Sequence, residues 1–139
     1  MGKQTRRLRV YVAGPYTKGD TILHIREAIQ AGNKLLARGF APFVPHTNVL
    51  WHLLDPQPDT VWLDLDNEFL PCCDMLLRLP GESKGADAEV ALARSLSLFV
   101  YTDIDVLISQ CSPTTWVEPT ERPGPAAMGG LKKDGSENV

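Results

Sequence analysis

One carboxylate stands out in this chain because its neighbours on the predicted helix are apolar. Glu89 ends the segment 80–89, PGESKGADAE, which directly follows the apolar run Asp74–Leu79. The residues three, four and seven positions later are Leu92, Ala93 and Leu96, so Glu89 lies on the face that a helix turns toward a sheet. Burial there would raise its pKa, while the nearby helix N-terminus would favour the charged form. Such opposed influences are typical of functional carboxylates, although a boundary glutamate that bends toward solvent gives the same pattern.

A second acid, Asp66, falls on an aromatic helix face. It shares this face with Trp62, Phe69 and Leu70, where a carboxylate needs either a partner or a cleft. The alternative is that the polar residues of 64–68 form a solvated acidic face. If Asp66 lies in a cleft, it is a candidate general acid.

Tyr11 is the third candidate. It alternates with Val10 and Val12 in a β-rich run, so packing in the core would account for it. It also lies three residues before Gly14, near the carboxyl end of the predicted strand. A hydroxyl there could reach a carboxylate across the cleft.

Loops that precede helices supply the candidate binding residues. The loop 14–19 precedes a helix as phosphate-binding loops do, but it matches neither the dinucleotide-binding nor the Walker pattern. Ser83 and Gly85 could contact a phosphate or ribose through a hydroxyl and backbone N–H groups, or could simply cap a helix. His46 follows a strand and suits the wall of a site better than a metal site. The candidate substrate-binding set is Gly14, Pro15, Tyr16, His46, Ser83, Gly85 and Asp87.

The periodicity predicts strands that alternate with helices. Strands are expected over 8–13, 41–44, 74–79 and 98–101, and helices over 20–38, 60–70, 84–95 and 102–108. The segment 47–59 is expected to be a loop, and a fifth strand could follow Ser109. This order predicts an α/β fold, a flavodoxin- or Rossmann-like three-layer sandwich with a four- to five-stranded parallel sheet. Ligands of such sheets bind at the carboxyl ends of the strands.

Length and composition narrow the function classes. The 139 residues suffice for one domain, expected over 1–117, with a flexible tail over 118–139. A net charge of −3 gives no electrostatic case for binding nucleic acid, and the basic run 3–9 is expected to be a solvated lead-in to the first strand. Three cysteines form neither a metal-type spacing nor an even disulfide set. No transmembrane or signal-peptide pattern is present, so we expect a reduced, cytoplasmic protein without membrane or nucleic-acid partners.

The motifs together resemble the nucleoside 2-deoxyribosyltransferase superfamily, including its nucleoside-monophosphate N-glycosidases. Three segments carry the resemblance: 11–14 (YVAG), 66–74 (DNEFLPCCD) and 83–89 (SKGADAE), in an order and spacing that fit over about 8–101. The resemblance implies that Glu89 attacks the anomeric carbon, that Asp66 lies near the reacting sugar and base, and that Tyr11 positions the nucleophile. It also implies phosphate or sugar contacts for Ser83 and Gly85, and a homodimer or larger homo-oligomer.

The chemistry that these residues permit agrees with that family. Breaking an N-glycosidic bond develops oxocarbenium character, which a carboxylate can stabilise or capture, and a second acid can protonate the leaving base. No metal or redox cofactor is needed. Where the phosphohydrolases have a serine after the first-motif glycine, this chain has Pro15, so nucleoside and 5'-monophosphate substrates both remain open; Thr17 or Lys18 could replace the lost contact. Trp51 and His46 could shape the base pocket.

Two other function classes fit parts of the pattern. A non-catalytic nucleotide-binding module would use the same crevice and explain Ser83, and a flavodoxin-like domain that binds a protein partner would need no ligand. Retention of Glu89, Asp66 and Tyr11 favours the enzyme, because buried carboxylates cost stability unless they are used or paired. The base, the sugar, and hydrolysis against base transfer are not specified by the sequence.

Overall fold

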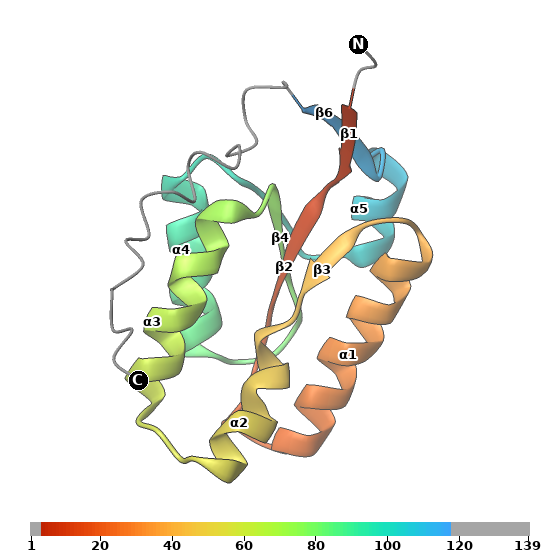
Figure 1. The fold of residues 1–139 in the computed structure, drawn as a ribbon. Coiled ribbons are helices and arrows are strands. Elements are labelled where there is room, and N and C mark those ends of the chain that lie inside the picture. The colour runs from red at the N-terminus through yellow and green to blue at the C-terminus, as the bar shows by residue number, and fades with distance from the viewer. Residues whose placement is uncertain (1–3, 118–139) are drawn as a thin grey trace, which may run out of the picture.

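The computed structural model describes residues 4–117, which form a sheet covered by helices on both faces (Figure 1). The predicted tail, 118–139, lies outside the described residues. In chain order the elements are β1 (Gln4–Arg7), β2 (Arg9–Ala13), α1 (Thr21–Ala37), β3 (Ala41–Phe43), the 3₁₀ helix η1 (Pro45–Asn48), α2 (Val49–Leu54), α3 (Asp59–Phe69), the 3₁₀ helix η2 (Leu70–Cys72), β4 (Met75–Arg78), α4 (Lys84–Ser95), β5 (Phe99–Tyr101), α5 (Ile104–Gln110) and β6 (Thr114–Val117).

The main sheet confirms the predicted fold class. Its four strands are parallel and lie in the order β3-β2-β4-β5. Helices α1 and α5 cover one face, and α3 and α4 cover the other (Figure 1). From β2 the chain first moves to one neighbour, β3, and then crosses to the other, β4. The carboxyl ends of β2 and β4 therefore form a switch point, where open α/β sheets bind their ligands.

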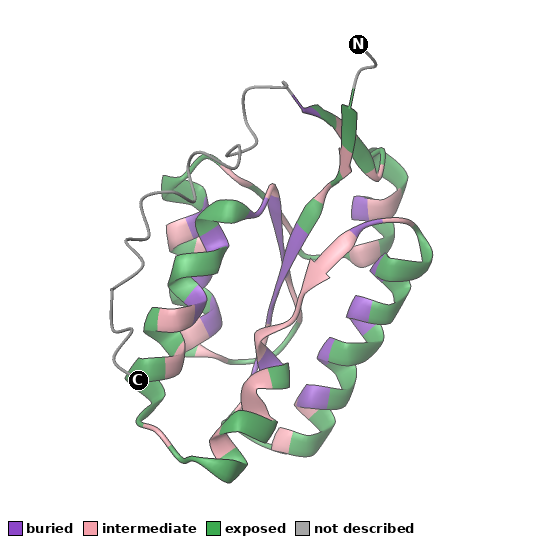
Figure 2. Ribbon diagram, viewed as in Figure 1, coloured by how far each residue is buried: buried purple, intermediate pink, exposed green. Residues whose placement is uncertain are grey.

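The alternation of side chains along β2 divides the core in two. Val10 and Val12 pack with residues of α1 and with Leu107 of α5, whereas Tyr11 and Ala13 pack on the opposite face. The buried positions follow the sheet and the inner faces of the helices (Figure 2). Since successive residues of a strand point to opposite faces, Tyr11 is directed toward the layer that contains α3 and α4. Among residues 4–117, no helix has the length and apolar character needed to cross a membrane.

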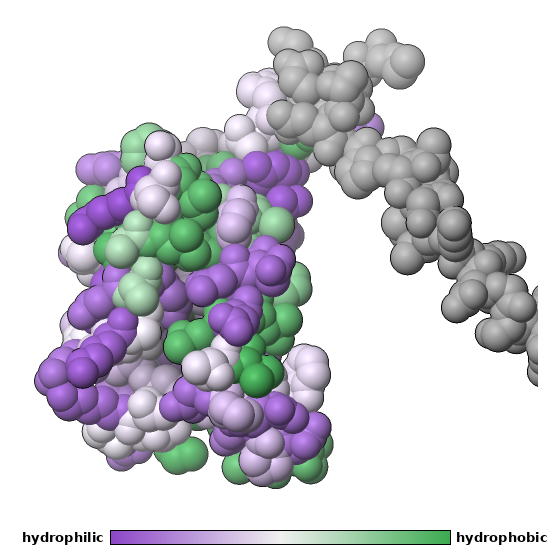
Figure 3. Space-filling model, turned by 90° about the vertical axis from the view of Figure 1, so that its left-hand side faces the viewer, coloured by the Kyte–Doolittle hydropathy of each residue, from purple (hydrophilic) through white to green (hydrophobic). Residues whose placement is uncertain are grey.

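The surface on the side of α3 and α4 is mixed. Apolar residues gather there in patches between charged ones (Figure 3). The exposed large apolar residues that α3 and the end of α4 contribute are Val61, Leu63, Phe69 and Leu96. Helix α3 thus leaves several large apolar side chains partly exposed to solvent.

The segment 47–59 is not the loop that its prolines suggested. It contains the end of η1 and the six-residue helix α2, whose residues are mostly apolar and none of which is buried. Helix α2 ends at Leu54, and Asp55, Pro56 and Pro58 follow it. The fixed φ angle and missing N–H of a proline do not continue a helix, and the residue before a proline is also disfavoured in helical conformation. The expectation of a loop was wrong because it gave the two prolines more importance than the preceding VLWHLL run.

The segment after Ser109 does form a strand, but not in the main sheet. Strand β6 pairs antiparallel with β1, Gln4 opposite Val117 and Arg7 opposite Thr114. The parallel sheet therefore has four strands. The basic run is also more than a lead-in, because residues 4–7 belong to this two-stranded sheet.

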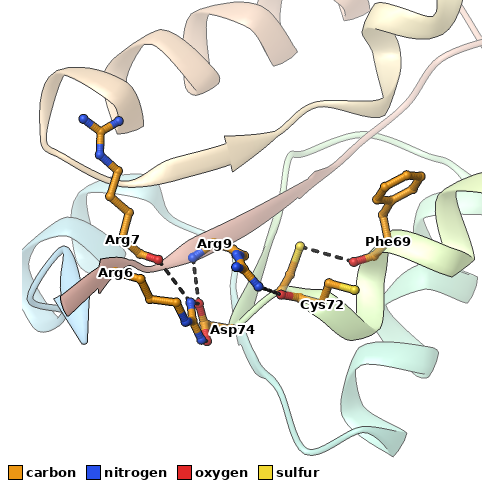
Figure 4. Close-up of polar contacts among 7 residues, drawn as sticks. Arg6, Arg7, Arg9, Phe69, Cys72 and Asp74 are labelled. Carbon is orange, nitrogen blue, oxygen red and sulfur yellow. Dashed lines mark hydrogen bonds and ion pairs between the residues drawn. The ribbon is translucent and has the colours of Figure 1, made fainter. Parts of the chain in front are cut away.

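Arginines of this run converge on one carboxylate before β4. Arg6 donates from Nη2 to Asp74 Oδ1 at 2.6 Å and from Nη1 to Oδ2 at 2.7 Å, and the backbone N–H of Arg9 donates to Oδ2 at 2.7 Å (Figure 4). The Arg9 side chain donates to the carbonyl of Cys72 at 3.2 Å. Burial alone would raise the pKa of Asp74, but these donors hold it below its ordinary value. The paired terminal strands are thus fastened to the start of β4.

Replacing Asp74 with asparagine should lower the free energy of unfolding by about 1–3 kcal/mol, because three charge-assisted bonds are weakened at once. The lowered pKa means that this stabilisation is present above the unfolded-state value and is lost as the pH falls through the folded-state value. Urea unfolding at pH 7 and pH 3 measures both effects. Asp64→Asn, at an exposed position on α3, is the control. Equal losses in the two variants would contradict the assignment.

Candidate active site

A cavity lies at the carboxyl ends of β2 and β4. Its volume is about 330 Å³, at the lower end of the range of about 300–1,000 Å³ usual for small-molecule sites. The β2–α1 loop, η1, α2, α3 and the start of α4 enclose it. The predicted residues that line it are Gly14, Tyr16, His46, Asp66, Ser83, Gly85 and Glu89. The switch point at the carboxyl ends of β2 and β4 therefore contains a cavity, and both acids line it.

Glu89 reaches the cavity from the second turn of α4. Ser83 caps this helix, its Oγ accepting from the N–H of Ala86 at 3.1 Å, and Ala86 and Ala93 are buried against the sheet. Glu89 shares their face and is only 9% exposed. Burial raises the pKa of Glu89 to about 7; the Tyr11 hydroxyl opposes the rise, the charge of Asp66 adds to it, and the charge of Arg78 opposes it.

Tyr11 lies behind Glu89 and is not among the residues that line the cavity. Its ring is fully buried and packs 5.5 Å from that of Phe43. Burial, followed by the charge of Glu89, raises the pKa of Tyr11 well above its ordinary value, so the hydroxyl keeps its proton. Within residues 4–117, neither Tyr11 Oη nor Glu89 Oε2 has a partner at regular hydrogen-bond geometry. The hydroxyl nevertheless lies near enough to affect the ionisation of Glu89.

Asp66 enters the cavity from the inner face of α3, where it is the buried residue of that helix. Asn48 Nδ2, from η1, donates to Asp66 Oδ1 at 3.2 Å. Burial raises the pKa of Asp66 to about 6, and the bond from Asn48 opposes this rise. Two buried carboxyls that act on each other thus face one cavity, and both can exchange protons near neutral pH.

His46 is held by the β2–α1 loop. Its Nε2 bonds to the carbonyl of Pro15 at 2.9 Å; because a carbonyl only accepts, Nε2 carries the proton. Burial lowers the pKa of His46, against the effect of the carbonyls of Pro15 and Gly14, so the ring is neutral. Its Nδ1 is then an acceptor, buried and without a partner among the described residues. Pro15 supports this histidine and does not itself line the cavity.

Two residues that were expected to contact the substrate, Asp87 and Trp51, do not line the cavity. Asp87 points away from the cavity and forms an ion pair with Arg78 at 2.9 Å. Trp51 is exposed and packs edge-on against Trp62, with ring centroids 5.2 Å apart. Trp62, not Trp51, is the tryptophan that lines the cavity.

Sequence reasoning missed the contribution of α2 and its flanks. Asn48, Val49 and His52 all line the cavity. His52 Nδ1 accepts from Trp62 Nε1 at 2.9 Å and from the N–H of Gln57 at 3.3 Å, so the proton of its neutral ring is on Nε2. Helical spacing over 49–54 would have placed Val49 and His52 on one face, but the segment was expected to be a loop.

The two loops at the mouth of the cavity contact each other. Gly81 has φ +115, and a Cβ there would approach Pro15 Cγ to 2.7 Å, so only glycine fits this crossing. Lys18 and Glu82, which face each other across the mouth, form an ion pair of 2.5 Å. Within residues 4–117, no group of three or more His, Cys, Asp or Glu is placed to hold a metal ion. The described site offers acid, base and nucleophilic groups on the protein itself.

Comparisons with known proteins give a likeness to solved structures and none to a family model or a curated protein. Among solved structures, the chain is similar to the 2-deoxyribosyltransferase of the psychrotolerant bacterium Bacillus psychrosaccharolyticus, a biocatalyst for the synthesis of antiviral and antitumoral nucleosides. The TM-score is 0.49 at 20% identity, and the match covers 66% of this chain and 69% of that one.

Proposed function

We propose that this protein cleaves the N-glycosidic bond of a nucleoside or a nucleoside 5'-monophosphate, with Glu89 as the nucleophile. The observation that carries the proposal is the pair of buried carboxyls, Glu89 and Asp66, with pKa values raised to about 7 and about 6, facing one cavity of small-molecule size. Groups that ionise near neutral pH suit nucleophilic and acid–base chemistry. The motifs in 11–14, 66–74 and 83–89 agree with this reaction class.

The first half-reaction exchanges one bond for another at the anomeric carbon. An ionised oxygen of Glu89 attacks that carbon while its bond to the base nitrogen breaks, so the bonding electrons leave with the base. Protonated Asp66 gives its proton to the departing base and becomes the carboxylate. The product is a glycosyl ester on Glu89 together with the free base.

The second half-reaction restores the carboxylate of Glu89. A water molecule attacks the anomeric carbon, Asp66 accepts its proton, and the ester bond to Glu89 breaks. If a second base enters instead of water, it becomes the new glycosyl acceptor, and the outcome is transfer. Both outcomes leave Glu89 ionised and Asp66 protonated for the next cycle, with no external oxidant or reductant. Because the pKa of Glu89 lies above that of Asp66, this reactive form is the minor one of the two singly protonated states of the pair.

The remaining lining residues have roles that follow from their polarity. Tyr11 lies behind the Glu89 carboxyl, and its hydroxyl favours the charged form of that group. Trp62 offers an aromatic face for the base, and the unpartnered acceptor His46 Nδ1 can receive a hydrogen bond from it or from the sugar. Ser83 and Gly85, at the start of α4, face the sugar or its phosphate.

The proposal is tested by chromatography of the protein after incubation with ribo- and deoxynucleosides and their 5'-monophosphates, with and without a second free base. Release of free base by the wild type, and not by Glu89→Gln, supports a glycosidase. A new nucleoside formed with the added base identifies a transferase. If no substrate is consumed while one raises the melting temperature, the non-catalytic binding module replaces the enzyme.

Replacing Tyr11 with phenylalanine should lower kcat/KM by about tenfold or more, because the hydroxyl that favours the charged form of the Glu89 carboxyl is lost. The melting temperature should hardly change, since Tyr11 Oη has no regular partner whose loss would cost stability. Steady-state kinetics and thermal unfolding measure the two effects. Tyr101→Phe is the control, because its hydroxyl contacts Cys111 on the other side of the sheet. An unchanged kcat/KM in Tyr11→Phe would leave Tyr11 with a packing role only.

A further inference from the structure

One arginine joins three parts of the active-site edge. Arg78 is the last residue of β4, and its side chain is only 14% exposed. Its Nη1 donates to the carbonyl of Leu79, and its Nη2 donates to the carbonyl of Gly81 and to Asp87 Oδ1, each at 2.9 Å. The fork of one guanidinium therefore connects the strand end, the following loop and the first turns of α4.

The loop held in this way forms part of the cavity. Glu82 and Ser83, directly after Gly81, both line it, and Ser83 caps the helix that carries Glu89. Gly81 also adopts the positive φ angle that brings the loop against Pro15. The bond from Arg78 to the Gly81 carbonyl thus fixes the backbone at the point where the two loops of the mouth meet.

The same guanidinium supplies positive charge to the site. The described groups that act on the Glu89 carboxyl are Tyr11 on β2, Asp66 on α3 and Arg78 on β4. Asp66 disfavours a charged Glu89, whereas Arg78 favours it. Because Asp87 is 71% exposed, solvent screens its charge more than that of the enclosed arginine.

We propose that Arg78 is a positioning residue of this site: its guanidinium holds the 79–83 loop against α4, and its charge favours the nucleophilic, ionised form of Glu89. The consequence for turnover rests on the proposed function of Glu89. The consequences for loop order and for the ionisation of Glu89 do not, and they can be measured without any substrate.

Three variants separate the two roles. Arg78→Gln removes both the charge and the fork, Arg78→Lys keeps the charge and loses the fork, and Asp87→Asn removes the ion pair while Arg78 stays charged. Carboxyl ¹³C NMR of glutamate-labelled protein, with the Glu89 signal assigned from its absence in Glu89→Gln, follows the ionisation. Amide hydrogen exchange over 80–85 follows the order of the loop.

In Arg78→Gln we expect the pKa of Glu89 to rise and exchange over 80–85 to accelerate. In Arg78→Lys exchange should accelerate while the pKa stays close to the wild-type value, and in Asp87→Asn the pKa should not rise. An unchanged titration and unchanged exchange in both Arg78 variants overturn the proposal, as does a rise in the pKa in Asp87→Asn equal to that in Arg78→Gln.

Kinetics adds a readout that depends on the reaction. In Arg78→Gln, kcat/KM should fall by about tenfold or more, as expected when a reacting group is misplaced, and its acid limb should move to higher pH. If the wild type turns over no nucleoside or nucleotide, the proposed function fails while the NMR and exchange results still decide the role of Arg78. If the wild type is active and the acid limb of Arg78→Gln does not move, the electrostatic role fails.

Discussion

Glu89→Gln is expected to lower turnover by at least about 10³-fold while leaving the folded protein as stable as the wild type or more so. Glutamine keeps the size of the side chain but cannot form the glycosyl ester. It also removes a carboxyl whose charge is disfavoured by burial, so the folded state loses an unfavourable term. Loss of a residue that serves only packing has the opposite signature, in which activity and stability fall together.

The comparison needs an acid that is chemically matched and lies elsewhere. Glu68→Gln, at an exposed position of α3, removes the same charge from the protein surface. Product formation by chromatography and thermal unfolding of both variants complete the test. Turnover by Glu89→Gln at the rate of Glu68→Gln would show that Glu89 is not the nucleophile.

The second large effect is on the pH dependence of stability. In the folded protein the pKa of Glu89 is about 7, against 4.5 for the free side chain, so between these values the folded state binds more protons than the unfolded state. The contribution of Glu89 to stability is therefore fully present below pH 4.5 and is lost as the pH rises through about 7. The shift corresponds to a loss on the order of 3 kcal/mol.

This effect is measured as the difference in free energy of unfolding between the wild type and Glu89→Gln. Subtracting the free energy of unfolding of wild type from that of Glu89→Gln cancels groups that titrate alike in both, including Asp74, whose contribution has the opposite sign. The difference should increase from pH 4.5 to about pH 7 and then level off. Urea unfolding at half-unit intervals of pH measures it. A difference that does not vary with pH would mean that Glu89 titrates normally.

The site residues that could be predicted from the sequence are those that interrupt a short-range, regularly spaced pattern of apolar residues. Glu89 and Asp66 stood out because an acid interrupts an apolar face at helical spacing, and this pattern is visible within a few residues. Their burial in the structure agrees with that pattern. Tyr11 was ambiguous between core and site from its strand alone, and the structure shows why, since its ring is in the core and its hydroxyl is beside Glu89.

The features that the sequence did not reveal depend on distant partners. The residues of β1 show no apolar alternation, and their partner strand lies at the far end of the described chain, so their pairing has no local signal. Asp87 was expected in the cavity because its motif is there, but the side chain turns to Arg78 on the preceding strand. Trp51 was expected to shape the base pocket, but α2 leaves its side chain exposed, and Trp62 of α3 lines the cavity instead. Short-range patterns identify faces of elements, whereas which side chain occupies a cavity depends on packing between them.

The pairing of β1 with β6 has a topological consequence. Because Gln4 lies opposite Val117, the chain enters and leaves the described unit at one place. Its start is beside the amino end of β2 (Figure 1), whereas the cavity is at the carboxyl end of that strand. Units whose ends adjoin tolerate insertion into a host loop and circular permutation. The paired strands β1 and β6 therefore close the described unit, and another protein joined to either of them would leave the opening of the cavity accessible.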